Sequence, residues 1–335
     1  MLLFNRTFTA PIVLKSDDSA IELAARDLQR DLRYLRDQEN GFDIVRSSSV
    51  SAVTVSIDSI GEESYRIDIT DSSVNIVGGD ALGAVFGIYA FSKEILGFSP
   101  MYRLTDVLPE KQMELVAPAR VIISPERKVK FRGWFLNDED LLTDFKEGGG
   151  KRRIDYPFYE NVMRPDVLDM ILECALRLEN NLIIPSSFVN IDNPAEEKLV
   201  ETVCRRGLYV SQHHVEPMGV SYFGADNYIK ERGAEGEAVS FIQNRPRMVE
   251  IWRYYAKKWA KYGDRVVWQL GLRGKADQAV WKSDSSVPAN AKTRGDIISD
   301  AIATEHEIVC KALGTDRFYS TVTLWMEGSE LYGKG

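Results

Sequence analysis

The chain has 335 residues, of which 44% are hydrophobic and 27% charged, and its formal net charge is −8 at pH 7. This composition indicates a folded protein of about two domains and excludes disorder along the whole chain. No apolar run approaches the ~18 residues of a membrane-spanning helix, and the acidic balance argues against nucleic acid or an anionic membrane as a partner. The start of the chain lacks a basic segment followed by a long apolar run. We therefore expect a cytoplasmic protein, or an extracellular one if the N-terminus is truncated.

The first part of the chain shows short strand patterns and two helical patterns. Alternating or continuous apolar residues predict strands at 12–14, 53–57, 65–69 and 74–76. Apolar residues at helical spacing predict helices at 21–35 and 81–96. The segment from Pro109 to Pro125 has the composition of a connector. We therefore expect a small α/β domain over residues 1–125.

From residue 126 onward, short apolar runs alternate with longer helical patterns. The predicted strands are 129–136, 181–184, 208–210, 266–272 and 319–324. The predicted helices are 165–179, 195–206, 245–262 and 295–313. Alternating strands and helices predict a parallel sheet, and five such units fit the first part of a (β/α)8 TIM barrel. We expect an incomplete TIM-barrel catalytic domain of about five βα units over residues 126–335, with an open sheet as the alternative.

Polar side chains follow these predicted strands. They are Asn137, Asp138, Asn190, His213, His214, Arg273, Asp277, Trp325 and Glu327. Parallel strands bring their carboxyl ends to one edge, so these groups are expected to converge. Two carboxyl groups, one protonated and one ionised, are what glycoside hydrolysis requires. An arginine can hold a substrate carboxylate in a bidentate pair, and a tryptophan (Trp134, Trp281 or Trp325) can offer an apolar face to a sugar ring.

Each of these residues also has a purely structural interpretation. Asp138 suits the cap of a helix after the first strand, and the two histidines can be satisfied by backbone partners. Arg273 and Asp277 can form a structural ion pair. Only the shared location at strand ends favours a functional site. No cofactor is expected, and no metal ion either, because a zinc site would need its ligands from widely separated segments.

Several motifs, in the same order along the chain, resemble those of glycoside hydrolase family 115, the xylan α-1,2-glucuronidases. The motifs are GGDALGAVFGIYAFSKEILGFSPMY, KFRGWFLNDED, NLIIPSSF, SQHHVEPM, GLRGKAD and LWMEGSELYGKG. The resemblance runs from about residue 64 to the end of the chain. It implies a TIM-barrel catalytic domain, an inverting mechanism and, before the barrel, a small α/β domain like that of family 20 hexosaminidases.

The resemblance also implies roles for the strand-end residues. Glu327 is the expected general acid, and Asp138 or Asp277 the expected general base. Arg273, together with His213 or His214, is expected to bind the uronate carboxylate. The residues expected to contact the rest of the sugar are Asn137, Asn190 and Trp325.

The chain departs from the family pattern at a few positions. Val215 separates His214 from Glu216, which leaves open which histidine faces the substrate. Lys275 stands where an acid is expected, and Phe188 where a tryptophan is expected. The chain stops at Gly335 whereas family members continue, so we expect a truncated protein.

The sequence therefore predicts a glycosidase that removes α-1,2-linked (4-O-methyl-)glucuronic acid from xylan or xylo-oligosaccharides. Two alternatives remain. One is a truncated carbohydrate-binding remnant without turnover, and the other a glycosidase for a neutral or N-acetylated sugar. The expected partner is an oligosaccharide or polysaccharide, with a homodimer as a possible assembly.

Overall fold

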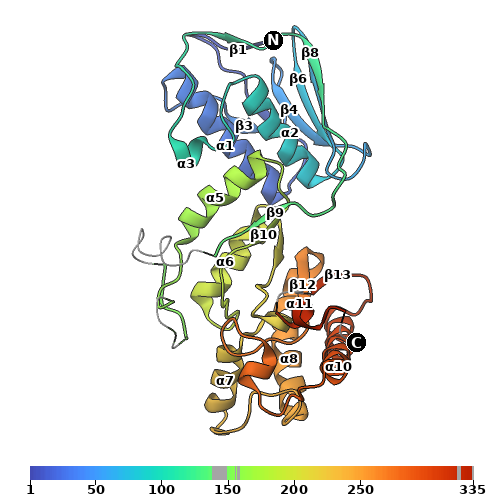
Figure 1. Cartoon of the computed structure of the whole chain (residues 1–335). Helices are drawn as coiled ribbons and strands as arrows, with labels where there is room; N and C mark the ends of the chain where they lie inside the picture. The colour runs from blue at the N-terminus through green and yellow to red at the C-terminus, as the bar shows by residue number, and fades with distance from the viewer. Residues whose placement is uncertain (138–148, 155, 157–158, 323–325, 334–335) are drawn as a thin grey trace. The chain divides into compact units, whose positions relative to one another are not determined.

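The computed structural model describes residues 1–137, 149–154, 156, 159–322 and 326–333 (Figure 1). The chain divides into two compact units. The first comprises Met1–Trp134, Asp169–Leu182 and Arg205–Leu208. The second comprises Phe135–Leu168, Ile183–Cys204 and Tyr209–Gly335. Each unit is described on its own below.

The first unit contains a six-stranded sheet with the strand order β3-β2-β4-β6-β5-β8. The strands are β2 (Ile12–Leu14), β3 (Ile44–Val45), β4 (Val53–Ile57), β5 (Tyr65–Ile69), β6 (Val74–Gly78) and β8 (Arg120–Ile123). β2, β4 and β6 pair in parallel, whereas β5 pairs antiparallel with both β6 and β8. Two further short strands, β1 (Leu2–Phe4) and β7 (Leu115–Val116), pair antiparallel. All four strands predicted for this region are confirmed.

Helices α1 (Ser19–Arg36) and α2 (Ala81–Glu94) pack against each other and against one face of this sheet (Figure 1). A third, single-turn helix, α3 (Tyr102–Thr105), follows. The N-terminus of α1 is fixed by Asp18, whose carboxylate accepts the backbone N–H of Ala20 at 2.8 Å. Both predicted helices of this region are confirmed.

A cluster of charged side chains is buried inside the first unit, between α1, α2 and the C-terminal half of α5 (Pro165–Arg177). Arg177 donates to Asp31 at 2.6 Å and to Glu173 at 2.9 Å. The exposed fractions of these three side chains are 1%, 0% and 1%. The guanidinium of Arg177 also lies 4.8 Å from the ring centroids of Tyr89 and Tyr102. We call Asp31, Glu173 and Arg177 the buried ion cluster.

A second large sheet has the strand order β13-β12-β11-β10-β9. Its strands are β9 (Gly133–Phe135), β10 (Leu182–Ile184), β11 (Tyr209–Ser211), β12 (Val266–Leu270) and β13 (Tyr319–Val322). β12 pairs in parallel with β11 and with β13. The five predicted strands and the mixed α/β class are thus confirmed. In the residues that the structure describes, the sheet is open, with β9 and β13 at its edges, and no closed barrel forms.

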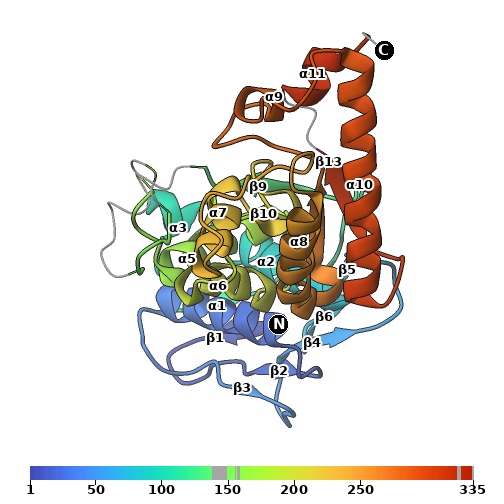
Figure 2. The ribbon, with the colours of Figure 1, turned by 90° about the horizontal axis from the view of Figure 1, so that it is seen from below.

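The helices that alternate with these strands include all four that the sequence predicts. After α5 come α6 (Pro194–Arg205), α7 (Tyr222–Glu231), α8 (Arg245–Trp259), α9 (Val280–Ser283), α10 (Ala291–Leu313) and α11 (Glu327–Leu331). Two 3-10 turns lie between them, Pro217–Gly219 and Ala260–Arg265. α8 and α10 pack side by side (Figure 2). No helix in the described part of the chain is both long and apolar enough to cross a membrane.

Candidate active site

Gly271 begins the turn that follows β12 and leads to Arg273. Its φ of 115° is readily adopted only by glycine. The backbone N–H of Gly271 donates to Glu305 Oε2 of α10 at 2.7 Å. Glu305 is fully buried, and this burial raises the pKa of its carboxyl well above the ordinary value. A neutral Glu305 can anchor the turn without requiring a buried counter-charge.

Arg273 brings two carboxyl groups together. Its guanidinium donates to Glu327 through Nη1, and through Nη2 to Asp277 Oδ1 at 2.5 Å. The Arg273 side chain is 1% exposed, that of Glu327 6% and that of Asp277 55%. The ion pair between Arg273 and Asp277, one of the two interpretations of the sequence, is therefore present. It includes Glu327 from a segment 54 residues away along the chain.

The two carboxyl groups have pKa shifts in opposite directions. Burial raises the pKa of Glu327 above 4.5, and this outweighs the opposing effects of Arg273 and of the backbone N–H of Val280, which donates to Glu327 Oε1 at 2.8 Å. Partial burial acts in the same sense on Asp277. There, however, hydrogen bonds from Arg273 and His214 prevail and hold the pKa of Asp277 below 3.8. Two carboxyl groups with diverging pKa values are the usual basis for a division into acid and base.

The two histidines have different environments. His214 Nε2 lies 2.8 Å from Asp277 Oδ1, so His214 belongs to the charged group. His213 is buried, its ring stacked on Phe135 at a centroid distance of 4.3 Å. Burial, followed by the nearby positive charge of His214, lowers the pKa of His213 to about 3. Among the described residues neither ring nitrogen of His213 has a hydrogen-bond partner, and both nitrogens are buried.

The low pKa of His213 gives a direct prediction. Because its folded pKa is below the ordinary value of 6.5, the ring should remain neutral from pH 5 to 8. A two-dimensional NMR titration of the imidazole C–H resonances, with His213→Asn for assignment, measures this. Movement of the His213 resonance near pH 6.5 would contradict the buried, neutral imidazole.

The remaining predicted residues differ in their placement. Asn137 Oδ1 accepts the hydroxyl of Ser187 at 2.9 Å. Asn190 Oδ1 accepts the backbone N–H of Asp192 at 2.9 Å and the hydroxyl of Tyr255 at 3.4 Å. These hydrogen bonds of Asn190 go to residues outside the group formed by Arg273, Asp277 and Glu327. The predicted residues Asp138 and Trp325 lie outside the described residues.

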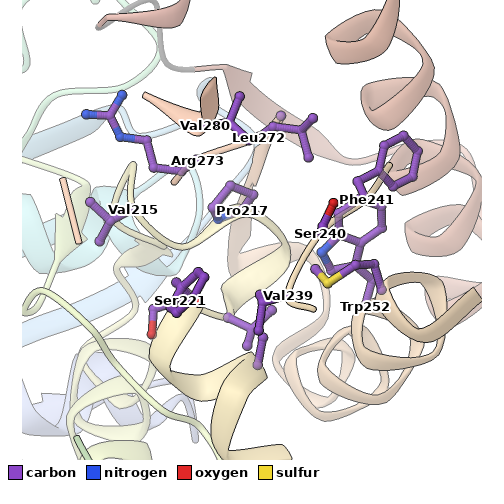
Figure 3. A pocket seen from close by; sticks show the side chains of 15 residues that line it. Val215, Pro217, Ser221, Val239, Ser240, Phe241, Trp252, Leu272, Arg273 and Val280 are labelled. Carbon is purple, nitrogen blue, oxygen red and sulfur yellow. The ribbon is translucent and has the colours of Figure 1, made fainter. Parts of the chain in front are cut away.

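Two hollows adjoin the charged group. One, of about 260 Å³, is lined by His214 and Glu327 together with apolar residues that include Ile298 and Ile302 of α10. The other, of about 50 Å³, is mainly apolar (Figure 3). The guanidinium of Arg273 points away from its Phe241 and Trp252 walls in that view. Only the larger hollow approaches the ~300–1,000 Å³ of typical ligand sites.

The sequence did not indicate three residues that shape the site. Phe135 stacks on His213, Val280 hydrogen-bonds Glu327, and Glu305 anchors the turn before Arg273. Phe135 lies two residues before Asn137, and the period of two in a strand could have indicated it. A backbone donor such as that of Val280 leaves no signal in the sequence.

The sequence matches the model of one protein family. The family model described as glycosyl hydrolase family 115 matches residues 124–335, the larger part of the chain. No curated protein sequence matches significantly.

Solved structures show a similar fold. A family 115 4-O-methyl-α-glucuronidase with specificity for decorated arabinogalactans superposes with a TM-score of 0.77 at 19% identity, covering 100% of this chain and 44% of that one. A family 138 enzyme targeting pectin rhamnogalacturonan II has a TM-score of 0.53 at 12% identity, over 96% of this chain and 37% of that one. A family 20 exo-β-N-acetylglucosaminidase from Vibrio harveyi has a TM-score of 0.56 at 12% identity, over 95% of this chain and 52% of that one. The chain thus spans less than half the length of the first structure.

Proposed function

Since the chain belongs to glycoside hydrolase family 115, we propose that it removes α-1,2-linked (4-O-methyl-)glucuronic acid from xylan or xylo-oligosaccharides. The family match confirms the resemblance seen in the motifs. The observation that carries the proposal is the pair of carboxyl groups on Arg273, because Glu327 has a raised pKa and Asp277 a lowered one.

The proposed reaction is an inverting hydrolysis. Protonated Glu327 donates its proton to the glycosidic oxygen as the bond to the anomeric carbon breaks. Asp277 or Asp138 takes a proton from the water whose oxygen attacks the opposite face of that carbon. The expected separation of acid and base is ~6.5–9.5 Å, which leaves room for the water.

The proposed substrate contacts follow from the charge states of the residues. Arg273 and His214 are the proposed partners of the uronate carboxylate. A neutral His213 suits a sugar hydroxyl better than a carboxylate, because each ring nitrogen can donate or accept one hydrogen bond. Asn137 and Asn190 are proposed to bind further hydroxyl groups.

The proposed architecture is a small α/β domain over residues 1–125 and a TIM-barrel type domain over 126–335. The order of the five strands along the chain supports the barrel assignment, since neighbours in a (β/α) barrel follow each other in sequence. The similar fold of the family 20 enzyme supports the assignment of the small domain.

Incubation of the chain with reduced aldouronic oligosaccharides tests the function. One-dimensional proton NMR should show free glucuronic acid, released first as the β anomer because inversion of an α linkage yields β. The matched control is Glu330→Gln, which changes an exposed glutamate on the same helix α11 as Glu327. Initial release of the α anomer would contradict the inverting mechanism. Binding without release would favour the carbohydrate-binding alternative.

A second substrate has one specific observation in its favour. The family 115 structure with a TM-score of 0.77 is an enzyme with specificity for decorated arabinogalactans. The same assay should therefore include glucuronidated arabinogalactan fragments and an N-acetylhexosaminide. Release from arabinogalactan alone would replace xylan as the substrate, and release from the hexosaminide alone would overturn the uronate assignment.

A further inference from the structure

A groove lined mainly by basic and polar residues lies along α1 within the first unit. This helix is blue in Figure 1. The groove consists of two adjoining hollows of about 430 and 380 Å³, which share Asp37, Gln38 and Lys111. We call this the α1 groove, and its chemically important residues are Arg6, Arg33, Tyr34, Arg36, Gln38 and Lys111. All of them lie in residues 1–134.

Two arginines of the α1 groove, Arg33 and Arg36, are held by backbone carbonyls, although Asp37 and Glu39 also line the groove. Arg33 donates to the backbone carbonyl of Gly41 at 3.1 and 3.2 Å, and Arg36 donates to the carbonyls of Asn5 and Arg6, both at 3.2 Å. Neither arginine has an ion-pair partner among the residues that the structure describes. These carbonyl contacts hold the guanidinium groups in place while their charge remains free to attract an anion. This local positive charge contrasts with the net charge of the whole chain, which is −8.

Lys111, another cation of the groove, is easily displaced from its partner. Lys111 pairs with Asp37 at 2.5 Å, but the two side chains are 49% and 69% exposed, so the pair contributes little to stability. Lys111 Nζ also lies 5.5 Å from the ring centroid of Tyr34. A ligand that approaches Tyr34 can therefore gain Lys111 as a partner at little cost.

Tyr34 adds an aromatic surface to this charge. Its ring packs edge-on against the buried Phe98 at a centroid distance of 5.9 Å, which fixes the ring in position. Gln38 offers an amide beside it. An aromatic ring for the apolar face of a sugar, an amide for hydroxyl groups and arginines for carboxylates together match an acidic carbohydrate.

We propose that the α1 groove is a second carbohydrate-binding site, specific for an oligosaccharide that carries uronic acids. The choice of a sugar acid as the ligand rests on the proposed function. The binding site itself does not, because it needs no turnover. Its role is to hold an acidic polysaccharide through carboxylates other than the one on the sugar to be cleaved.

Isothermal titration calorimetry with tetragalacturonate, its methyl ester and xylotetraose tests the proposal. Tetragalacturonate should bind, and the two neutral probes should bind at least tenfold more weakly. Arg33→Gln and Arg36→Gln should each lower the affinity about tenfold, since each removes a charge-assisted hydrogen bond. Arg66→Gln, on β5 of the same unit and paired with Asp68, is the matched control and should bind normally.

Further variants separate recognition from folding and from the candidate active site. Arg33→Lys and Arg36→Lys should restore most of the binding through charge, and Tyr34→Phe should keep it whereas Tyr34→Ala should lose it. Binding should also persist in an Arg273→Gln background, whatever the activity. Loss of binding in that background, with no effect of the α1 variants, would place the ligand elsewhere and overturn the proposal. Equal competition by inorganic sulfate would also overturn it, because the groove would then be a general anion patch.

Discussion

Glu327→Gln is expected to lower kcat for glucuronoxylan oligosaccharides about 10²–10⁴-fold, the usual contribution of a general acid. Gln is nearly isosteric, and its single amide oxygen can still accept from one of the two donors, the N–H of Val280 or the guanidinium of Arg273, so the fold around it should be kept. An aryl glucuronide with a good leaving group should be far less affected, because its departure needs no proton. This contrast between substrates distinguishes loss of an acid from a structural defect.

The pH profile provides the second readout for this variant. In the version of the proposed mechanism with Asp277 as the base, activity requires Glu327 protonated and Asp277 ionised. The rate should therefore fall as the pH rises through the raised pKa of Glu327, and fall as the pH drops through the lowered pKa of Asp277. In Glu327→Gln the alkaline fall should disappear while the acidic one remains. A profile of kcat/KM with its alkaline limb intact would show that another group is the acid.

Arg177→Met should lower the free energy of unfolding by about 3–5 kcal/mol, the largest stability effect expected for a single substitution here. Methionine fills much of the same volume but removes the buried cation shared by Asp31 and Glu173, which keep the partly exposed Arg30 as a partner. It also removes the cation from between Tyr89 and Tyr102.

Urea unfolding followed by circular dichroism measures the effect of Arg177→Met. The control is Arg26→Met on α1, whose partner is Glu22 and whose exposed fraction is 65%; it should cost at most ~1 kcal/mol. Equal losses in the two variants would mean that the buried ion cluster contributes no more than a surface pair.

The secondary structure was largely predictable because its signals are local. Pro165 at the start of α5 and Gly314 after α10, with a φ of 68°, mark helix ends by their backbone preferences. α7 was missed because its Tyr222–Glu231 segment has only 10 residues and its buried positions include Gly224 and Ala225. The buried ion cluster was also missed, although Asp27 and Asp31 lie one helical turn apart on the buried side of α1. Acidic residues are usually taken as exposed, and only packing against Arg177 and Arg206 explains their burial.

The candidate site was predictable to the extent that parallel strands place their carboxyl ends together. That rule brought Arg273, Asp277 and Glu327 into one group, and His214 with them. It did not predict that Asn190 would turn to Tyr255, because loop conformation after a strand end is set by tertiary contacts. Nor could it assign charge states, since the lowered pKa of His213 depends on burial rather than on residue type.

The shared guanidinium has a consequence for the pH range of the proposed chemistry. Arg273 favours ionisation of both Glu327 and Asp277, whereas burial opposes ionisation of both. Loss of the Arg273 charge would therefore raise both carboxyl pKa values together. Under the proposed mechanism both limits of activity would then move toward alkaline pH, so a substitution at this one cation would displace the working range as a whole.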